Sequence, residues 1–207
     1  MNKEFFLMDE KEMAPWIMVA KAKRKRQHTD PPIDPLGWTE PRGPIELTLL
    51  DEGEFWPDII GCGSVLRGLY VSERVKLDWD TEGIDYGKCF PATVVGEVPP
   101  ALENVPAPMY YWMGTHVGAR LDMVKCGYTN IRTSRRTGET YGEDAKRIVF
   151  AEGSWDGSDL FIAWQPPTQI FCTRRIIDLA TKYRWTNFKF VPIEHAYDRP
   201  FHPGVPY

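Results

Sequence analysis

The chain has 207 residues, 43% of them hydrophobic, and a formal net charge of −4. This length and composition suit one large folded domain and exclude a disordered or fibrous chain. No apolar run approaches the ~20 residues that a membrane-spanning helix needs. Because the N-terminus resembles no secretory signal and the four cysteines lack metal-knuckle or redox spacing, we expect a cytoplasmic protein without a cofactor or a bound metal.

Residues 1–44 are predicted as an N-terminal segment. Phe5 to Met8 and Trp16 to Ala20 are short apolar runs that favour strands. A basic run from Lys21 to Arg26 follows, and residues 28–44 then hold five prolines, which predicts an irregular loop. Ile45 to Leu50 alternates well enough to predict the next strand.

Residues 68–96 predict a strand, a helix and a second strand. Leu69 to Val71 are strand-like, and the Ser72 hydroxyl is suited to accept a hydrogen bond from a helix N-terminus. The helix is expected from Glu73 to about Thr81, ended by Gly83. Phe90 to Val95 favours the strand that follows.

The next part of the chain has weaker patterns. Met109 to Trp112 favours a strand, and the polar stretch from Thr133 to Gly142 predicts an exposed loop. Lys146 to Ala151 and Leu160 to Trp164 flank a glycine-rich link, which predicts a hairpin with a long loop.

Residues 167–194 predict a second strand, helix and strand. Ile170 to Cys172 are strand-like, and Thr173 is the expected helix N-cap. Apolar residues at helical spacing run from Arg174 to Tyr183, and Phe188 to Ile193 favours a strand. Residues 195–207 are expected to form a C-terminal tail.

The two strand–helix–strand stretches resemble each other. Leu69 to Val75 matches Ile170 to Ile176 position by position, each with an apolar triplet, a hydroxyl residue, a charged residue, an arginine and a β-branched residue. Because an arginine in the first helical turn opposes the helix dipole, Arg74 and Arg175 are expected to be held by a carboxylate or by carbonyl groups. The sequence therefore predicts an α+β fold: a mixed, mostly antiparallel sheet with a few helices, in two similar halves within residues 45–194.

Several of these stretches also resemble a known family. Trp56-Pro57-Asp58-Ile59-Ile60 followed by Leu69 to Val75 is similar to a stretch of the polymorphic-toxin immunity proteins of family eleven, the myxobacterial immunity-type domain. Tyr110 to Trp112 with Leu121-Asp122 resembles that family's central strand, and Ile170 to Thr173 with Phe188 to Phe190 its closing half. The later copy departs from the pattern at Thr173-Arg174-Arg175. The resemblance implies a protein that binds and blocks a bacterial toxin, and it brings no catalytic residues.

Acidic residues gather in the middle of the chain. Residues 51–103 hold eleven acidic and four basic side chains, and tryptophans stand among them. An inhibitor of a nuclease toxin gains association rate from such charge, and tryptophan is a frequent interface anchor. The predicted partner-binding residues are Asp51, Glu52, Glu54, Trp56, Asp58, Asp78, Trp79, Asp80, Glu82 and Asp85.

Two other functions stay open at this point. An enzyme could pair Cys126 with His116, or Cys172 with His195, as nucleophile and base, or use paired carboxylates such as Asp78 and Asp80 or Asp156 and Asp159. A nucleic-acid adaptor could contact phosphates through Lys21 to Arg26, although the acidic balance of the chain disfavours this. The sequence does not indicate the oligomeric state.

Overall fold

The computed structural model describes residues 4–10, 19–23, 41, 43–50, 53–62, 69–133, 140–164 and 169–196. Its strands are β1 (Phe5–Glu10), β2 (Val19–Lys23), β3 (Ile45–Leu49), β4 (Ile59–Cys62), β5 (Leu69–Ser72), β6 (Lys88–Val94), β7 (Tyr110–Gly114), β8 (Val117–Arg120), β9 (Thr129–Thr133), β10 (Thr140–Glu143), β11 (Leu160–Trp164), β12 (Ile170–Thr173) and β13 (Phe188–Pro192). Its helices are α1 (Glu73–Glu82), α2 (Met123–Cys126) and α3 (Arg174–Tyr183), with short 3₁₀ turns η1 (Pro100–Leu102) and η2 (Ile193–His195).

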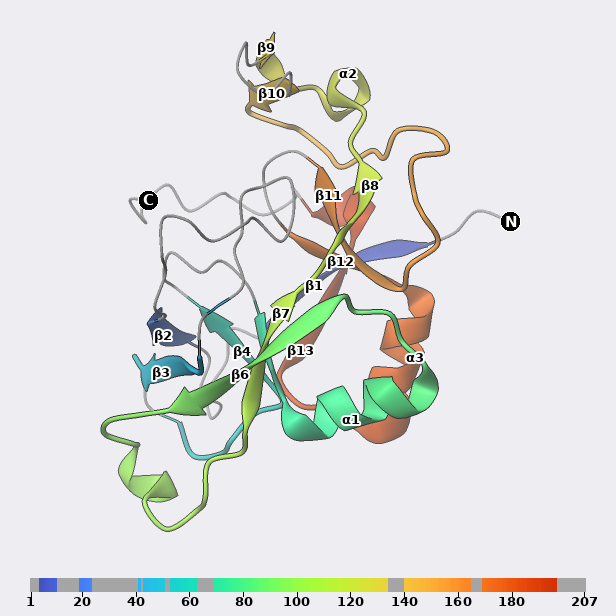
Figure 1. Cartoon of the computed structure of the whole chain (residues 1–207). Helices are drawn as coiled ribbons and strands as arrows, with labels where there is room; N and C mark the ends of the chain where they lie inside the picture. Colours follow the sequence, from blue (N-terminus) through green and yellow to red (C-terminus); the bar gives the residue numbers. More distant parts are fainter. Residues whose placement is uncertain are drawn as a thin grey trace.

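The strands form two main sheets, and the predicted α+β class is confirmed. The first sheet is a closed barrel in the order β2-β3-β6-β7-β5-β4, and the second is open, in the order β13-β1-β12-β11-β8. Most neighbouring strands are antiparallel, while β2–β4, β3–β6 and β8–β11 are parallel. Figure 1 shows α1 and α3 on one side of the molecule and the β9–β10 hairpin at another end.

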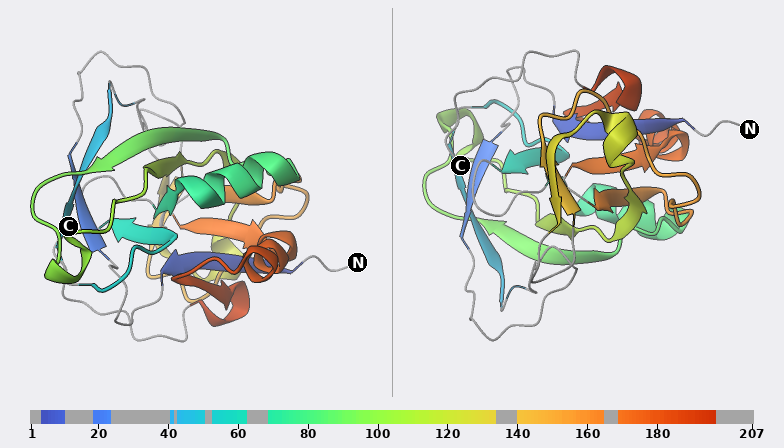
Figure 2. Two further views of the ribbon diagram at one scale, coloured as in Figure 1. Left: turned by 90° about the horizontal axis from the view of Figure 1, so that it is seen from below. Right: turned by 90° about the horizontal axis from the view of Figure 1, so that it is seen from above.

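The two similar halves predicted from the sequence are present. The elements β12 and α3 begin and end 101 positions after β5 and α1, and β11 and β13 follow β4 and β6 at nearly the same spacing. In Figure 2 the barrel strands β2 and β3 lie at one end of the molecule, and α3 lies at the other in both views. We call the barrel with α1 the first unit, and the open sheet with α3 the second unit.

The helices α1 and α3 end in the same way but differ in the hydrogen bonding of their N-caps. The Ser72 hydroxyl accepts a hydrogen bond from the Val75 amide, as an N-cap does. Thr173 is the N-cap residue of α3, as predicted, but its side chain makes no capping hydrogen bond. Gly83 and Arg184, at equivalent positions, both close their helix in the left-handed conformation.

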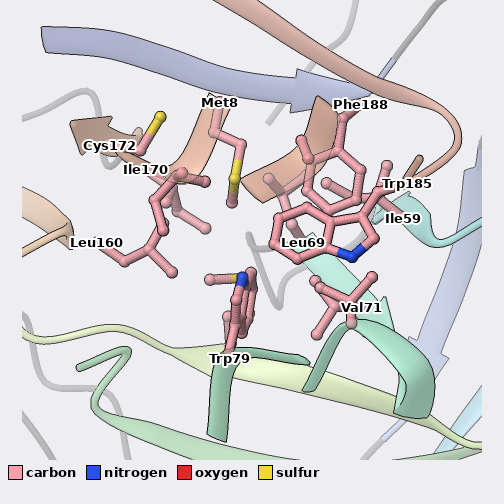
Figure 3. Packing of buried hydrophobic residues seen from close by; sticks show 14 of the residues in the cluster. Met8, Ile59, Leu69, Val71, Trp79, Leu160, Ile170, Cys172, Trp185 and Phe188 are labelled. Carbon is pink, nitrogen blue, oxygen red and sulfur yellow. The ribbon is translucent and has the colours of Figure 1, made fainter. Parts of the chain in front are cut away.

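One apolar core is shared by the two units. Alternate residues along each sheet face it, because successive side chains of a strand point to opposite faces. Ile59 of β4 faces this shared core, whereas the adjacent Ile60 faces the barrel interior. Figure 3 shows Trp79 from α1 and Trp185 from the segment after α3 entering the shared core together. Phe161 and Phe171 belong to a third core on the other face of the second unit.

Two other expectations need correction. Residues 146–151 do not pair with β11 as a hairpin, because β11 pairs instead with β12 and β8. Part of the loop expected from Thr133 to Gly142 is a strand, β10, which pairs with β9. The N-terminal segment enters both sheets through β1 and β2.

Several predicted features lie outside the described residues. These are Arg24 to Arg26 of the basic run, most of the proline-rich loop, and the tail after Ala196. Among the described helices, none has the length and apolar character needed to cross a lipid bilayer.

Candidate protein-binding surface

The predicted acidic residues do not form one surface. Asp51 and Glu52 lie outside the described residues. Asp58 and Trp79 are buried, and Asp78, Asp80 and Glu82 each contact a donor elsewhere in the chain. Asp85 is exposed and accepts a hydrogen bond from the Gly87 amide. Among the predicted residues that the structure describes, Glu54 is exposed and Trp56 is half-buried beside it.

Asp58 is a structural residue, so its prediction as a partner contact is wrong. It is only 5% exposed. Its carboxylate accepts hydrogen bonds from the Ser72 hydroxyl at 2.8 Å and from the Thr186 amide at 2.7 Å, and it forms an ion pair with Arg74. Such a carboxylate has no free acceptor side for another protein, because a buried charge is tolerated only when it is paired.

The prediction for Trp79 is also wrong. Its side chain has no exposed surface, and its ring meets that of Trp185 edge-on, with the centroids 6.0 Å apart. Figure 3 shows both rings inside the shared core. An indole at this position stabilises the packing between the units and does not reach a partner.

Asp78 and Asp80 of α1 are both engaged in internal contacts. Trp185 Nε1 donates to Asp78 Oδ2 at 2.7 Å. The hydrogen bond from Lys76 to Asp80, at 2.7 Å, lowers the pKa of that carboxyl, and the bond from the Tyr86 hydroxyl lowers it further. Because these carboxylates already have donors, they attract a basic partner less than their number suggests.

Glu82 connects the two units. Its carboxylate accepts one hydrogen bond from Lys182 Nζ at 2.5 Å and another from the Tyr183 hydroxyl at 2.6 Å. Both donors come from α3, and their hydrogen bonds lower the pKa of the Glu82 carboxyl. Its role is therefore to hold α1 against α3.

The repeated motif forms a clamp that occurs twice. In the first unit, Asp58 accepts hydrogen bonds from Ser72 and Arg74. In the second unit, Asp159 accepts from the equivalent residues, from the Thr173 hydroxyl at 2.6 Å and from Arg175 Nη1 at 2.7 Å. The prediction that a carboxylate or carbonyls hold the two arginines is confirmed.

Each arginine of the clamp also reaches the other unit. Arg74 donates to the Tyr183 carbonyl at the end of α3, at 3.0 Å. Arg175 donates to the Glu82 carbonyl at the end of α1, at 2.5 Å. A cation at a helix C-terminus is favourable, so the clamps join the two helices reciprocally. The sequence analysis named Asp58 as a partner contact and Asp159 as part of a carboxylate pair, but it missed their role in the clamps. The signal is their spacing, since each stands fourteen positions before its hydroxyl residue.

Exposed apolar side chains occur on α1 and on the two segments beside its first turn. The exposed fractions are 51% for Phe55, 57% for Leu77, 47% for Val105 and 38% for Met109, and Trp56 is half-buried. We call these five residues the apolar rim.

Three hydrogen bonds hold the segments of the apolar rim together. Trp56 Nε1 donates to the Val105 carbonyl at 3.0 Å, and the Tyr110 hydroxyl donates to the Pro57 carbonyl at 2.8 Å. The Glu73 amide donates to the Met109 carbonyl at 2.8 Å, which places this segment at the first turn of α1. Leu77 stands one helical turn after Glu73.

Carboxylates accompany the apolar rim. Glu54 precedes Phe55, Glu73 lies at the Met109 carbonyl, and Glu103 stands two positions before Val105; all three side chains are exposed. Both basic residues of α1 already form ion pairs, Arg74 with Asp58 and Lys76 with Asp80. The surface therefore combines apolar anchors with negative charge.

The second unit shows that the fold does not require these apolar residues. The residue equivalent to Phe55 is Asp156, and the one equivalent to Leu77 is Asp178. Strand pairing gives the third equivalence: Tyr110 pairs with Ser72 as Phe5 pairs with Thr173, so Met109 corresponds to Glu4. All three counterparts are charged and exposed. The second unit thus carries charged residues at these three equivalent positions.

The alternative catalytic pairs gain no support from the geometry. Burial raises the pKa of the Cys126 and Cys172 thiols, which keeps them protonated and poorly nucleophilic at neutral pH. His116 Nε2 lies 3.2 Å from Asp156 Oδ2, and the Ser158 hydroxyl donates to the other oxygen of that carboxylate at 2.6 Å.

No group of three or more histidine, cysteine, aspartate or glutamate side chains within the described ranges is arranged to hold a metal ion. The chain matches no family model and no curated protein sequence.

Proposed function

We propose that this protein is a non-catalytic inhibitor that binds another protein through the apolar rim, and that it acts in the cytoplasm as an immunity protein against a bacterial toxin. The apolar rim supplies the contact surface, and the flanking carboxylates favour a partner that is basic around its own apolar patch. A nuclease toxin, which grips phosphates with basic residues, has that character.

The observation that carries this proposal is the difference between the two units at equivalent positions. Exposed apolar side chains lower solubility and mark interaction sites when they gather. Phe55, Leu77 and Met109 are exposed, and their counterparts are Asp156, Asp178 and Glu4. Since the second unit folds with charged residues at the equivalent positions, the apolar rim is best explained by binding to a partner.

The composition of the apolar rim also suits a protein partner. Aromatic residues and methionine are enriched at the centres of interfaces, and a polar margin surrounds them. Trp56 is held by the Val105 carbonyl and is therefore presented in a fixed position. Complementary charge on Glu54, Glu73 and Glu103 speeds association and excludes acidic partners. Nucleic acid is such an excluded partner, since phosphates would meet these carboxylates.

The first test is capture of the partner from the native host with the tagged full-length chain, followed by mass spectrometry. We expect a basic toxin to be recovered. The double variant Leu77→Asp with Met109→Glu installs the charges of the second unit. It should weaken binding by about 30-fold or more, as loss of two interface anchors does, while its circular dichroism spectrum stays that of the wild type.

The matched control is Val124→Asp. Val124 lies on α2 and is 81% exposed, so it is an apolar residue of the surface outside the apolar rim. This variant should capture the partner as the wild type does. The function is then read in cells that express the captured protein: wild type and V124D restore growth, and the double variant does not. Equal protection by all three, or recovery of a protein that is not toxic, would contradict the proposal.

A further inference from the structure

Strand β1 occupies in the second unit the place that β7 occupies in the first. β7 lies between β5 and β6 and is antiparallel to both. β1 lies between β12 and β13 and is likewise antiparallel to both. Yet β7 follows β6 in the chain, whereas β1 comes from the N-terminus.

The pairing register is the same in both places. Tyr111 pairs with Val71 and Pro91 in the first unit. Phe6 pairs with Cys172 and Pro192 in the second. Val71 and Cys172, like Pro91 and Pro192, are 101 positions apart in the sequence. Tyr111 and Phe6 are therefore equivalent by two independent strand pairings.

The residues of the two strands match in this register. Phe5-Phe6-Leu7-Met8 aligns with Tyr110-Tyr111-Trp112-Met113, two aromatic residues followed by a large apolar residue and methionine. Met8 and Met113 both enter the shared core, and Figure 3 shows Met8 pointing into it from β1. Leu7 and Trp112 face the interiors of their own units.

The equivalence extends to the first strand of each unit. β2 runs parallel to β4, with Val19 opposite Gly61. β8 runs parallel to β11, with Val117 opposite Ile162. Gly61 and Ile162 are again 101 positions apart. Each unit thus contains the same five strands in the same order, and β3 additionally closes the first sheet into a barrel.

We infer that the chain is built from two copies of one unit, and that β1 is the last strand of the second copy, carried at the opposite end of the chain. The first copy is continuous from β2 to β7. The second copy runs from β8 to β13 and is completed by β1. The slot between β12 and β13 is therefore a binding site for an extended segment with two aromatic residues, a large apolar residue and methionine.

Burial shows what this segment contributes. Phe6, Leu7 and Met8 are 6%, 8% and 3% exposed. At the start of the strand, Glu4 forms an ion pair with Arg174 at 2.8 Å, and the Arg174 guanidinium lies 4.8 Å from the centre of the Phe6 ring. The segment fills part of two cores and is fixed at its end, so the second unit is incomplete without it.

The experiment is a circular permutant of the whole chain that restores the order of the first unit. Residues 1–10 are moved behind Tyr207 through a flexible glycine–serine linker, so that β1 follows β13. Pro192 at the end of β13 pairs with Phe6 at the start of β1, which makes this connection short in space. We expect the near-ultraviolet circular dichroism of the wild type and a single cooperative unfolding transition.

Met8→Asp, made in the permutant and in the native order, tests whether the moved strand is docked. It should lower the thermal midpoint by a similar amount in both chains. A folded permutant whose midpoint does not respond to M8D would overturn the inference, because β1 would then not occupy the slot.

A second measurement uses the native order, with a protease site inserted between β1 and β2. After cleavage, the N-terminal peptide should stay bound through gel filtration, and the thermal midpoint should become dependent on concentration, as for any bound partner. Release of the peptide while the remainder keeps its original midpoint would also overturn the inference.

Discussion

At the scale of single residues, the two clamp aspartates differ in burial. The Asp58 side chain is 8% exposed and that of Asp159 is 19% exposed. Asp58 also accepts from the Thr186 amide and hydroxyl, so it satisfies more donors. The two carboxylates therefore make the same contacts within their motif. They differ in the number of hydrogen-bond donors that would lose their acceptor if the carboxylate were removed.

We predict that Asp58→Asn destabilises the protein more than Asp159→Asn. Asparagine keeps one acceptor oxygen but puts an amide donor in place of the other, so Arg74 loses its charged partner and some buried donors face another donor, which costs about 3 kcal/mol. The more exposed pair of Asp159 and Arg175 should cost about 1 kcal/mol. Urea denaturation of both variants checks this, and an equal or reversed order of midpoints would show that burial does not decide the strength of the clamp.

At the scale of elements, the helix C-caps form a natural comparison. Gly83 has φ 64° and Arg184 has φ 54°, both in the left-handed region. A side chain there is strained by roughly 1 kcal/mol or more, whereas glycine is not. A Cβ at Gly83 would meet nothing within 4 Å, so strain is the only cost of adding one.

Gly83→Ala is accordingly expected to destabilise the protein by about 1 kcal/mol, and Arg184→Gly to stabilise it by about 0.5–1 kcal/mol. Thermal unfolding of the two variants measures both. The Arg184 carbonyl, which lies 3.5 Å from Arg74 Nη2, is kept in the glycine variant, so that contact is not the cause of any change. Stabilisation by both substitutions would contradict this account.

The elements that could be predicted from the sequence are those with local signals. Ser72 and Gly83 mark the ends of α1, and the stripe from Arg174 to Tyr183 marks α3. The position of β1 between β12 and β13 could not be predicted, because strand pairing across the whole chain leaves no local trace. The repeat was visible over seven positions, but the aspartates that complete it precede their hydroxyl residues by fourteen.

The binding surface was harder to predict than the fold. Acidic residues were expected to mark it, yet whether a carboxylate is available depends on donors far away in the sequence. Glu82 is occupied by Lys182, a hundred positions later. The candidate surface was indicated by apolar residues in the first unit whose equivalents in the second unit are charged, such as Leu77 and Asp178. This comparison can be made only when the alignment of the two units is known.

At the scale of the whole molecule, Glu82 and Lys182 link the units and should give stability a characteristic pH dependence. The pKa of Glu82 is lowered from 4.5 by its hydrogen bonds to Lys182 and Tyr183. A lowered carboxyl pKa stabilises the fold above the unfolded-state value and loses this effect as the pH falls through the folded-state value. The pKa of Lys182 is raised from 10.5 by its hydrogen bond to Glu82, so its contribution is present below 10.5 and is lost as the pH rises through the folded-state value.

We therefore expect Glu82→Gln to lower the urea midpoint most between pH 5 and pH 10, about the limits that the two unperturbed values set. The difference from the wild type should shrink as the pH falls below the unfolded carboxyl value and through the lowered folded-state value of Glu82. It should shrink likewise as the pH rises above the unfolded ammonium value and through the raised folded-state value of Lys182. The control is Glu152→Gln, which removes an exposed carboxylate from the loop before β11. A difference between E82Q and the wild type that persists unchanged at pH 3 would mean that the contact between α1 and α3 does not depend on this charge pair, and that the two units are joined by the shared core and the arginine clamps alone.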